Sequence, residues 1–301
     1  MSLFTSWISA LRPRTLFLAL AVTICGNGIA YSLGHFDISI CTLTMLMAVV
    51  LQLLSNLAND LGDFQHGTDI TGKRVGPERT VQSGAISPQA MKIGISISIG
   101  LSLLIGGVLI YNASIFINIW YMLLLMFLGV MSIWAALKYT IGSNPYGYKG
   151  LGDIAAFLFF GPVAVVGTCF LHVHKMTFAP WLPAIGLGLF TAAVLNINNM
   201  RDMDNDFTSG KTTLAIRLGL SKARLYHALL TIIGIASFVA YSVIYSNSWH
   251  QYLYLVWMFA FVFILYKIYT TDDKKQLDPY LKQTSIATFV LSVLFVISIN
   301  L

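Results

Sequence analysis

Residues 56–63 read Asn56-Leu57-Ala58-Asn59-Asp60-Leu61-Gly62-Asp63 and directly follow an uncharged apolar run at residues 38–54. If this first acidic stretch is helical, Asn56, Asn59, Asp60 and Asp63 stand at i, i+3, i+4 and i+7 and share one helix face. A second acidic stretch at residues 198–206 reads Asn198-Asn199-Met200-Arg201-Asp202-Met203-Asp204-Asn205-Asp206 and also ends an apolar run, residues 181–195. On a continuing helix Asn198, Asp202, Asn205 and Asp206 share a face, whereas Asp204 points elsewhere.

The composition is that of a membrane protein. The chain has 301 residues, of which 57% are hydrophobic and only 10% are charged, and its mean hydropathy is +0.76. A hydrocarbon core of about 30 Å is crossed by roughly 20 helical residues, so apolar runs near that length predict spanning helices. The sequence predicts an all-α polytopic membrane protein whose helices surround a central cavity. We expect nine transmembrane helices, at about residues 16–34, 39–59, 90–112, 115–137, 152–172, 180–198, 223–245, 252–270 and 284–301.

The basic residues predict the orientation. Of the 18 Lys and Arg residues, only Lys175 lies among the loops expected on the second side of the membrane. Because cytoplasmic loops carry the excess of Lys and Arg, we expect a cytoplasmic N-terminus and an external C-terminus in the inner, cytoplasmic membrane. The net charge of +6 is accounted for by this topology and by anionic lipid headgroups, so no nucleic-acid partner is predicted.

We expect one transmembrane domain over residues 1–301, with cytoplasmic cap loops at about residues 60–89, 138–151 and 199–222. The first loop is long, rich in glycine and charge, and adjoins the first acidic stretch, which favours a functional lid over a disordered segment. Asn59-x-x-x-Asp63 and Asn198-x-x-x-Asp202 also repeat at an offset of 139. Two halves related by this repeat would bring the two acidic stretches face to face.

Carboxylates at the ends of spanning helices are costly to bury without cations. Mg²⁺ prefers hard oxygen ligands and binds through one or two carboxylates together with substrate phosphate oxygens. Neither acidic stretch contains His or Cys, which argues against zinc or a redox metal. The two stretches therefore predict a Mg²⁺–diphosphate site, and an apolar helical bundle around it favours a lipid diphosphate as the substrate.

These stretches resemble the Asp-rich motifs of the UbiA superfamily of intramembrane aromatic prenyltransferases. Asn59, Asp60 and Asp63 match the first family motif, although Gly67 replaces its last Asp and Asp69 follows two residues later. The second stretch matches closely and continues into Lys211-Thr212-Thr213-Leu214-Ala215-Ile216-Arg217-Leu218-Gly219. Further matches, which are most similar to the menaquinone branch, are Arg12-Pro13-Arg14-Thr15-Leu16, Gly76-Pro77-Glu78-Arg79, Ser83-Gly84, Pro145-Tyr146-Gly147-Tyr148-Lys149-Gly150-Leu151-Gly152 and Phe159-Phe160-Gly161-Pro162-Val163.

The resemblance implies a Mg²⁺-dependent membrane enzyme. Its reaction would transfer a polyprenyl group from polyprenyl diphosphate to 1,4-dihydroxy-2-naphthoate, with loss of CO₂ and diphosphate, giving demethylmenaquinol. The implied metal ligands are Asp60, Asp63, Asp69, Asp202 and Asp206, and all of these except Asp69 are also the implied catalytic residues. The implied substrate-binding residues are Asn59, Arg79, Lys149, Asn198, Arg201 and Lys211.

Two alternatives remain open on the sequence. One is a sibling branch of the same superfamily, which would use 4-hydroxybenzoate, haem or chlorophyllide as the acceptor. The other is a cation-coupled transporter built from inverted repeats, which would hold its acidic residues near the middle of the membrane. The position of both acidic stretches at helix ends argues against the transporter.

Overall fold

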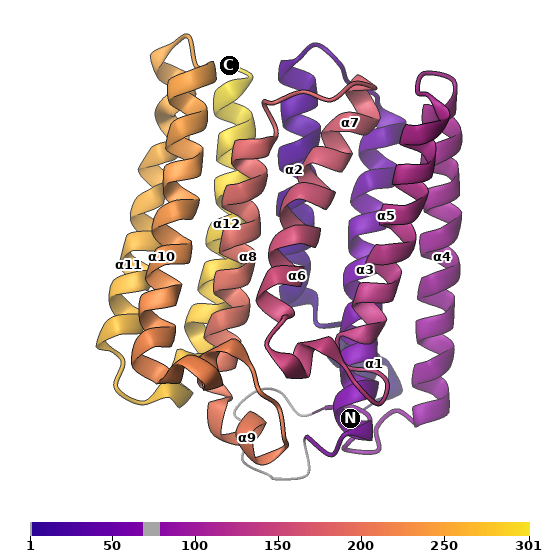
Figure 1. Ribbon diagram of the computed structural model, residues 1–301, viewed down its shortest axis with the longest axis vertical. Helices are drawn as coiled ribbons and strands as arrows, with labels where there is room; N and C mark the ends of the chain where they lie inside the picture. The colour runs from indigo at the N-terminus through magenta and orange to yellow at the C-terminus, as the bar shows by residue number, and fades with distance from the viewer. Residues whose placement is uncertain (1, 69–78) are drawn as a thin grey trace.

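The structure, a computed structural model, describes residues 2–68 and 79–301. Within these residues the regular structure is helical. The α-helices are α1 Leu3–Leu11, α2 Leu16–Ser32, α3 Ile38–Gln65, α4 Pro88–Ser114, α5 Ile119–Lys138, α6 Gly152–Leu158, α7 Gly167–Val173, α8 Trp181–Arg201, α9 Met203–Thr208, α10 Leu214–Tyr245, α11 Met258–Thr270 and α12 Asp278–Ile299. The long helices run side by side as one bundle (Figure 1).

Nine helical stretches in the described residues are long and apolar enough to cross a membrane, which confirms the predicted number. The first stretch, Leu3–Ser32, begins earlier than the predicted residue 16 because the short helix α1 precedes α2. Arg12 separates the two helices in a left-handed backbone conformation, with φ of 47°. The described chain starts in α1 and finishes beyond α12 at opposite ends of the bundle (Figure 1).

The end of the bundle where α3 and α8 finish carries α9 and the start of α6 (Figure 1), and we call it the acidic end. Asp37 begins α3 at the far end, where its carboxylate accepts hydrogen bonds from the backbone N–H groups of Ser39 and Ile40. These hydrogen bonds, led by the one from Ile40, lower the pKa of Asp37.

The fifth span is not one regular helix. A π-helical segment at Phe159–Val166 separates α6 from α7, and it contains Pro162, which has no backbone N–H to donate. Gly161 precedes this proline, and a Cβ at that position would lie 2.5 Å from the carbonyl oxygen of Ala184 on α8. A Gly-Pro pair within a helix favours a kink, and the structure shows a π-helical segment packed directly on α8.

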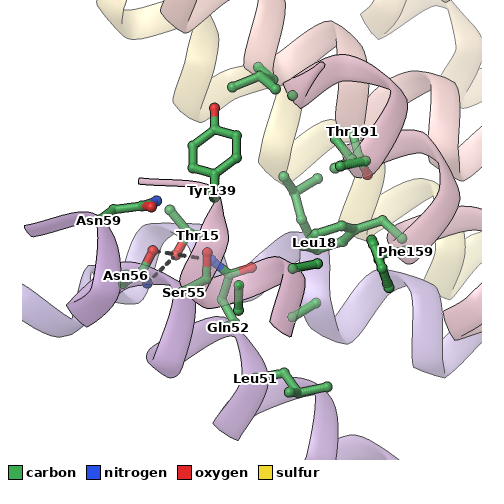
Figure 2. Close-up of a pocket in the computed structure, with 18 of the residues that line it drawn as sticks. Thr15, Leu18, Leu51, Gln52, Ser55, Asn56, Asn59, Tyr139, Phe159 and Thr191 are labelled. Atoms are coloured by element: carbon green, nitrogen blue, oxygen red, sulfur yellow. Dashed lines mark hydrogen bonds between the residues drawn. The ribbon is translucent and has the colours of Figure 1, made fainter. Parts of the chain in front are cut away.

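A cavity of about 470 Å³ lies inside the bundle, lined by residues of α2, α3, α5, α6 and α8 together with the π-helical segment. Figure 2 shows side chains of α2 and α3, among them Leu18, Leu51 and Gln52, opposite Phe159 and Thr191. The predicted central cavity is therefore present.

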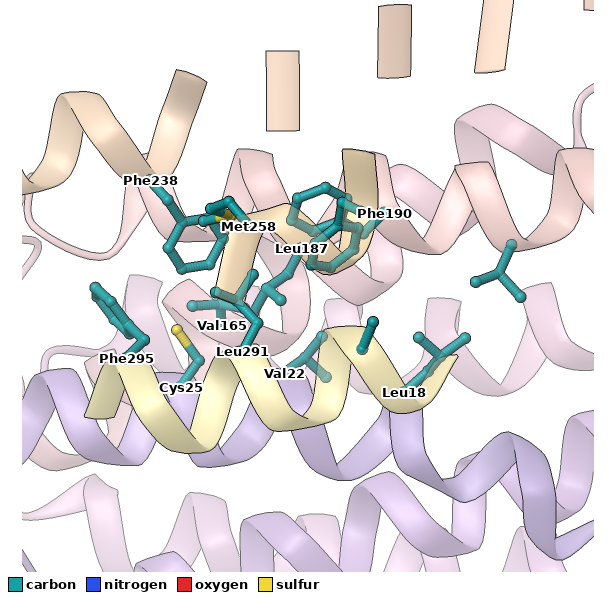
Figure 3. Close-up of a cluster of buried hydrophobic side chains, with 14 of the residues drawn as sticks. Leu18, Val22, Cys25, Val165, Leu187, Phe190, Phe238, Met258, Leu291 and Phe295 are labelled. Carbon is teal, nitrogen blue, oxygen red and sulfur yellow. The ribbon is translucent and has the colours of Figure 1, made fainter. Parts of the chain in front are cut away.

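The largest apolar core lies on one side of this cavity. Phe190, Phe238 and Phe295 are fully buried at its centre, where α8, α10 and α12 meet (Figure 3). Phe190 also stacks on Phe261 of α11, with ring centroids 4.2 Å apart. A smaller core joins α1, α3 and α4 around Leu54 and Met91. These two cores fix α8 and α3, the helices that carry the acidic stretches, on either side of the cavity.

Candidate active site

The cavity has a polar end and an apolar remainder. Both acidic stretches line it at the acidic end, and apolar side chains from as far as Leu109 of α4 and Leu171 of α7 line the rest. Both of these residues lie near the helix ends farthest from the acidic end. A long apolar tail could therefore extend along the bundle from a polar group held between the acidic stretches.

Asp63 is the carboxylate of the first acidic stretch that contacts basic side chains. It is 2% exposed, Arg79 donates a hydrogen bond to its Oδ2 atom, and Lys211 Nζ lies 3.0 Å from its Oδ1 atom. The Tyr148 hydroxyl donates to the same Oδ1 atom over 2.9 Å. Burial, followed by the charge of Asp63, raises the pKa of Tyr148, so this phenol stays protonated and can act as a donor.

Lys211 connects the two acidic stretches. Its Nζ atom contacts Asp63 at 3.0 Å and Asp206 at 3.6 Å, and it also lies 4.7 Å from the centroid of the Tyr148 ring. A second link is the hydrogen bond from the Asn205 side-chain amide to the carbonyl oxygen of Thr68, at 3.2 Å. The structure thus brings together two stretches that lie about half the chain apart in sequence.

Asp60 contacts the returning part of the first cap loop. Its Oδ2 atom accepts hydrogen bonds from the backbone N–H and the hydroxyl of Thr80, and its Oδ1 atom accepts from the backbone N–H of Val81. Asp60 is 1% exposed and lines the cavity. Its carboxylate therefore anchors residues 80–81 against α3, a task that the sequence did not indicate.

Gly62 explains how the end of α5 approaches this stretch. A Cβ at Gly62 would lie 2.5 Å from the Thr140 hydroxyl oxygen. Because no side chain intervenes, that hydroxyl reaches the carbonyl oxygen of Ala58 at 3.0 Å and the Asn59 side-chain oxygen at 3.1 Å. Asn59 is thereby held beside the cavity.

The sequence analysis placed the second acidic stretch on one continuing helix, but the structure divides it between two helices. Helix α8 ends at Arg201, Asp202 adopts φ −96° and ψ 9°, and α9 begins at Met203. Asp202, Asn205 and Asp206 are buried and line the cavity, and the half-buried Asn198 also lines it. The break redirects the chain, but Asp206 still faces Lys211 and, through it, Asp63.

Arg201 forms a fork on its neighbour Asp202. The Nε atom donates to Asp202 Oδ1 at 2.8 Å, and the Nη2 atom donates to Asp202 Oδ2 at 2.6 Å. Nη2 also donates to the Asn198 side-chain oxygen at 2.8 Å, and Nη1 donates to Asp278. Asp204 points away from the cavity, as expected, and pairs with Lys274 at 2.6 Å.

The structure places the remaining predicted residues unevenly. Arg79 is buried and lines the cavity beside Asp63. Lys149 is exposed and does not line the cavity, and its backbone carbonyl accepts a hydrogen bond from Arg217. Asp69 lies outside the described residues. The geometry therefore gives Lys149 no part in this site.

The donor set fits a hard divalent cation. Carboxylate and amide oxygens converge on the cavity, and the described residues contain no cluster of three His, Cys, Asp or Glu side chains close enough to hold a metal by themselves. Mg²⁺ commonly completes its coordination with water and substrate phosphate oxygens, so two carboxylates and neighbouring Asn oxygens suffice. The residues that could hold the ion are Asp63, Asp202, Asp206, Asn59 and Asn198.

The UbiA prenyltransferase family matches residues 19–293 of this chain. The chain belongs to the UbiA prenyltransferase family. It is 40% identical over 291 residues to 1,4-dihydroxy-2-naphthoate octaprenyltransferase of Haemophilus influenzae, covering 96% of this chain and 94% of the relative. It is 39% identical over 300 residues to the Escherichia coli protein of the same name, covering 98% and 95%. The chain is a multi-pass membrane protein, because it belongs to the UbiA family and residues 2–68 and 79–301 include nine helices apolar enough to span a membrane.

Solved UbiA structures share the fold at low sequence identity. An apo UbiA homologue from Aeropyrum pernix superposes with a TM-score of 0.69 at 16% identity, covering 94% of this chain and 96% of that one. A homologue from Archaeoglobus fulgidus bound to GPP and Mg²⁺ gives a TM-score of 0.66 at 13% identity, covering 98% and 100%. These likenesses confirm the all-α fold that the sequence predicted.

Two residues of this UbiA site were not among the predicted site residues. Tyr148 contacts Asp63, and its sequence signal was its place in the family match at residues 145–152, beside the predicted Lys149. Asp278 contacts Arg201 from 77 positions away, and it begins a helix without any neighbouring motif. Nothing local in the sequence distinguishes Asp278 from an ordinary residue at the start of a helix.

Proposed function

We propose that the chain transfers a polyprenyl group from polyprenyl diphosphate to 1,4-dihydroxy-2-naphthoate, releasing CO₂ and diphosphate and giving demethylmenaquinol. The observation that carries this proposal is the position of Lys211, which contacts Asp63 and Asp206 at the polar end of a cavity whose remainder is apolar. That arrangement suits a substrate with a charged head and a long apolar tail. The naphthoate acceptor is inferred from the two relatives, which are both 1,4-dihydroxy-2-naphthoate octaprenyltransferases.

The diphosphate head would lie between the two acidic stretches. Asp63, Asp202 and Asp206 would hold Mg²⁺ with help from Asn59 and Asn198, and when bound the ion supplies positive charge to the departing diphosphate. Arg79 and Lys211 already contact Asp63 and are close enough to the polar end to bind phosphate oxygens. These residues would stabilise the charge that develops as the bond between carbon and oxygen breaks.

The rest of the reaction proceeds in the apolar part of the cavity. The bond between the prenyl carbon and the diphosphate oxygen breaks, and diphosphate keeps the electron pair. The electron-rich ring attacks the allylic cation, and the carboxylate leaves as CO₂, returning its electron pair to the ring. Apolar side chains such as Leu18, Leu51 and Phe159 exclude water that would otherwise capture the cation.

The site is expected at the cytoplasmic face of the inner membrane. The acidic end is also the end with most of the basic residues, which the positive-inside rule assigns to the cytoplasm. Both substrates would then reach the site from the cytoplasmic leaflet or from the cytosol. On this view the whole chain acts as one transmembrane domain whose cap loops cover the diphosphate.

The test is an acceptor panel with the purified full chain, a prenyl diphosphate and Mg²⁺. We expect prenylated product and stoichiometric CO₂ from 1,4-dihydroxy-2-naphthoate, and neither from 4-hydroxybenzoate, haem or chlorophyllide. Prenylation of another acceptor, with none of the naphthoate, would move the chain to a sibling branch. Solute uptake by proteoliposomes without any prenyl transfer would instead favour the transporter, which the placement of the acids at one end argues against.

A further inference from the structure

The ion pair between Arg201 and Asp278 lies outside the diphosphate chemistry described above. Arg201 was expected to bind substrate, yet its guanidinium donates four hydrogen bonds to the protein itself. The Arg201 side chain is 1% exposed, so its charge depends on the protein for compensation. Of its two carboxylate partners, Asp202 lines the cavity, whereas Asp278 lies outside it at the first position of α12.

We propose that Arg201 and Asp278 are positioning residues, in which Asp278 holds the guanidinium that in turn orients the Asp202 carboxylate toward the metal. This inference rests on the proposed function for the identity of the metal site. A planar guanidinium that binds both oxygens of a carboxylate fixes its rotation as well as its position. Each Asp202 oxygen accepts one N–H and keeps a lone pair that can ligate a cation.

The charges of the cluster favour the same role. Arg201 carries one positive charge, and Asp202 and Asp278 together carry two negative charges, so the three groups leave one negative charge for an incoming cation. Without Asp278, the guanidinium would neutralise Asp202 alone, and the cluster would attract a divalent ion less strongly. Asp278 therefore affects cation affinity without any need to touch the cation.

The segment that presents Asp278 is attached to the second acidic stretch at one further point and to α10 at another. Lys274 pairs with Asp204 at 2.6 Å, and the backbone carbonyl of Thr271 accepts a hydrogen bond from Arg224 of α10. The connection between α11 and α12 therefore contacts the end of α8 through Asp278 and the start of α9 through Lys274. Asp204, which points away from the cavity, thus contacts the connection that leads to Asp278.

The test measures Mn²⁺ binding to the detergent-purified full chain by electron paramagnetic resonance, with an unreactive prenyl thiodiphosphate at a fixed concentration. Asp278→Asn keeps the shape of the side chain and removes its charge. We expect it to weaken Mn²⁺ binding about tenfold, because partners that orient metal ligands commonly contribute tenfold or more to affinity. Asp272→Asn is the matched control, since Asp272 is exposed on the same connection, and it should bind Mn²⁺ like the wild type.

Two more variants distinguish a positioning role from a general loss of folding. Asp278→Glu keeps the charge and should recover most of the Mn²⁺ affinity, whereas Arg201→Lys keeps a charge but loses the fork and should weaken binding. Wild-type affinity in a folded Asp278→Asn protein would overturn the inference, and so would wild-type affinity in Arg201→Lys if Asp278→Asn does not fold. Because no acceptor is present, a weakened Asp278→Asn variant would support the inference even if the naphthoate assignment failed.

Discussion

The two acidic stretches hold their carboxylates in different ways. Asp63 of the first stretch is contacted by groups from distant parts of the chain, namely Arg79, Tyr148 and Lys211. Asp202 of the second stretch is held by its own sequence neighbour, Arg201. The second stretch is therefore organised largely by α8 and α12, whereas the first requires the cap loops to be in place.

This difference indicates how the site could assemble. The loops that contact Asp63 also bring the groups that we expect to bind diphosphate, so the first stretch depends on these loops for both. At the second stretch, Asp202 is held by Arg201 at the end of α8 and does not contact the first cap loop through these hydrogen bonds. Variants in the two stretches should consequently fail in different ways.

The largest effects are expected at the carboxylates that both stretches contribute. Asp63→Asn and Asp202→Asn should each lower Mg²⁺-dependent prenyl transfer by about 10³-fold, because each removes charge that holds the ion opposite the diphosphate. Product formation measured by chromatography checks this, with thermal unfolding as the control for folding. Wild-type turnover by either folded variant would contradict the assignment of that stretch to the site.

Next in size is the loss of the bridging cation. Lys211→Ala should lower turnover by about 10²-fold, because it removes the group that contacts Asp63 and Asp206 together and leaves both carboxylates less compensated. Lys149→Ala is the matched control, because Lys149 is exposed outside the cavity, and we expect turnover within about twofold of the wild type. Equal losses in the two variants would mean that the cavity described here is not the site.

A smaller effect on turnover, with a clear effect on structure, is expected at Asp60. Asp60→Asn places an amide group against the N–H donors of Thr80 and Val81, which should cost about 1–3 kcal/mol for the unsatisfied donors. The first cap loop should then detach from α3. Limited proteolysis should cut within residues 79–87 faster than in the wild type, and an unchanged cleavage rate would show that Asp60 does not anchor the loop.

The smallest effect is expected at Tyr148. Tyr148→Phe removes the hydroxyl that donates to Asp63 but keeps the ring beside Lys211. Loss of one hydrogen bond to a charged group should cost about 1.5 kcal/mol, which corresponds to a turnover about tenfold lower. Asp202 is held by Arg201 and not by Tyr148. We therefore expect Tyr148→Phe to leave the Mn²⁺ contacts of the second stretch unchanged.

The sequence predicted the fold well because membrane-spanning helices are encoded by the length of apolar runs alone. The nine spans, the cavity and the meeting of Asn59 and Asp63 with Asn198 and Asp202 were all expected. The π-helical form of Phe159–Val166 was not, because a Gly-Pro pair indicates an irregularity without specifying its kind. The predicted orientation across the membrane and the predicted metal ligands remain predictions.

Side-chain partners were harder to anticipate than helix positions. Arg201 was predicted to bind substrate from the family resemblance, but its partner Asp278 comes from a helix start far along the chain. Asp60 shares the helix face of Asp63. The spacing could not reveal that residues 80–81 donate hydrogen bonds to both carboxylate oxygens of Asp60. Lys149 was predicted from a motif that lines the cavity through Tyr148, but Lys149 itself is exposed outside the cavity.

The central claim is that the two acidic stretches form one site, and a double-mutant cycle tests it most directly. Turnover would be compared for the wild type, Asp63→Asn, Asp202→Asn and the double variant, all as folded full chains. Residues that act as a unit are strongly non-additive, so the double variant should be little slower than the slower single variant. Losses that multiply in the double variant would show two independent sites and would contradict this account.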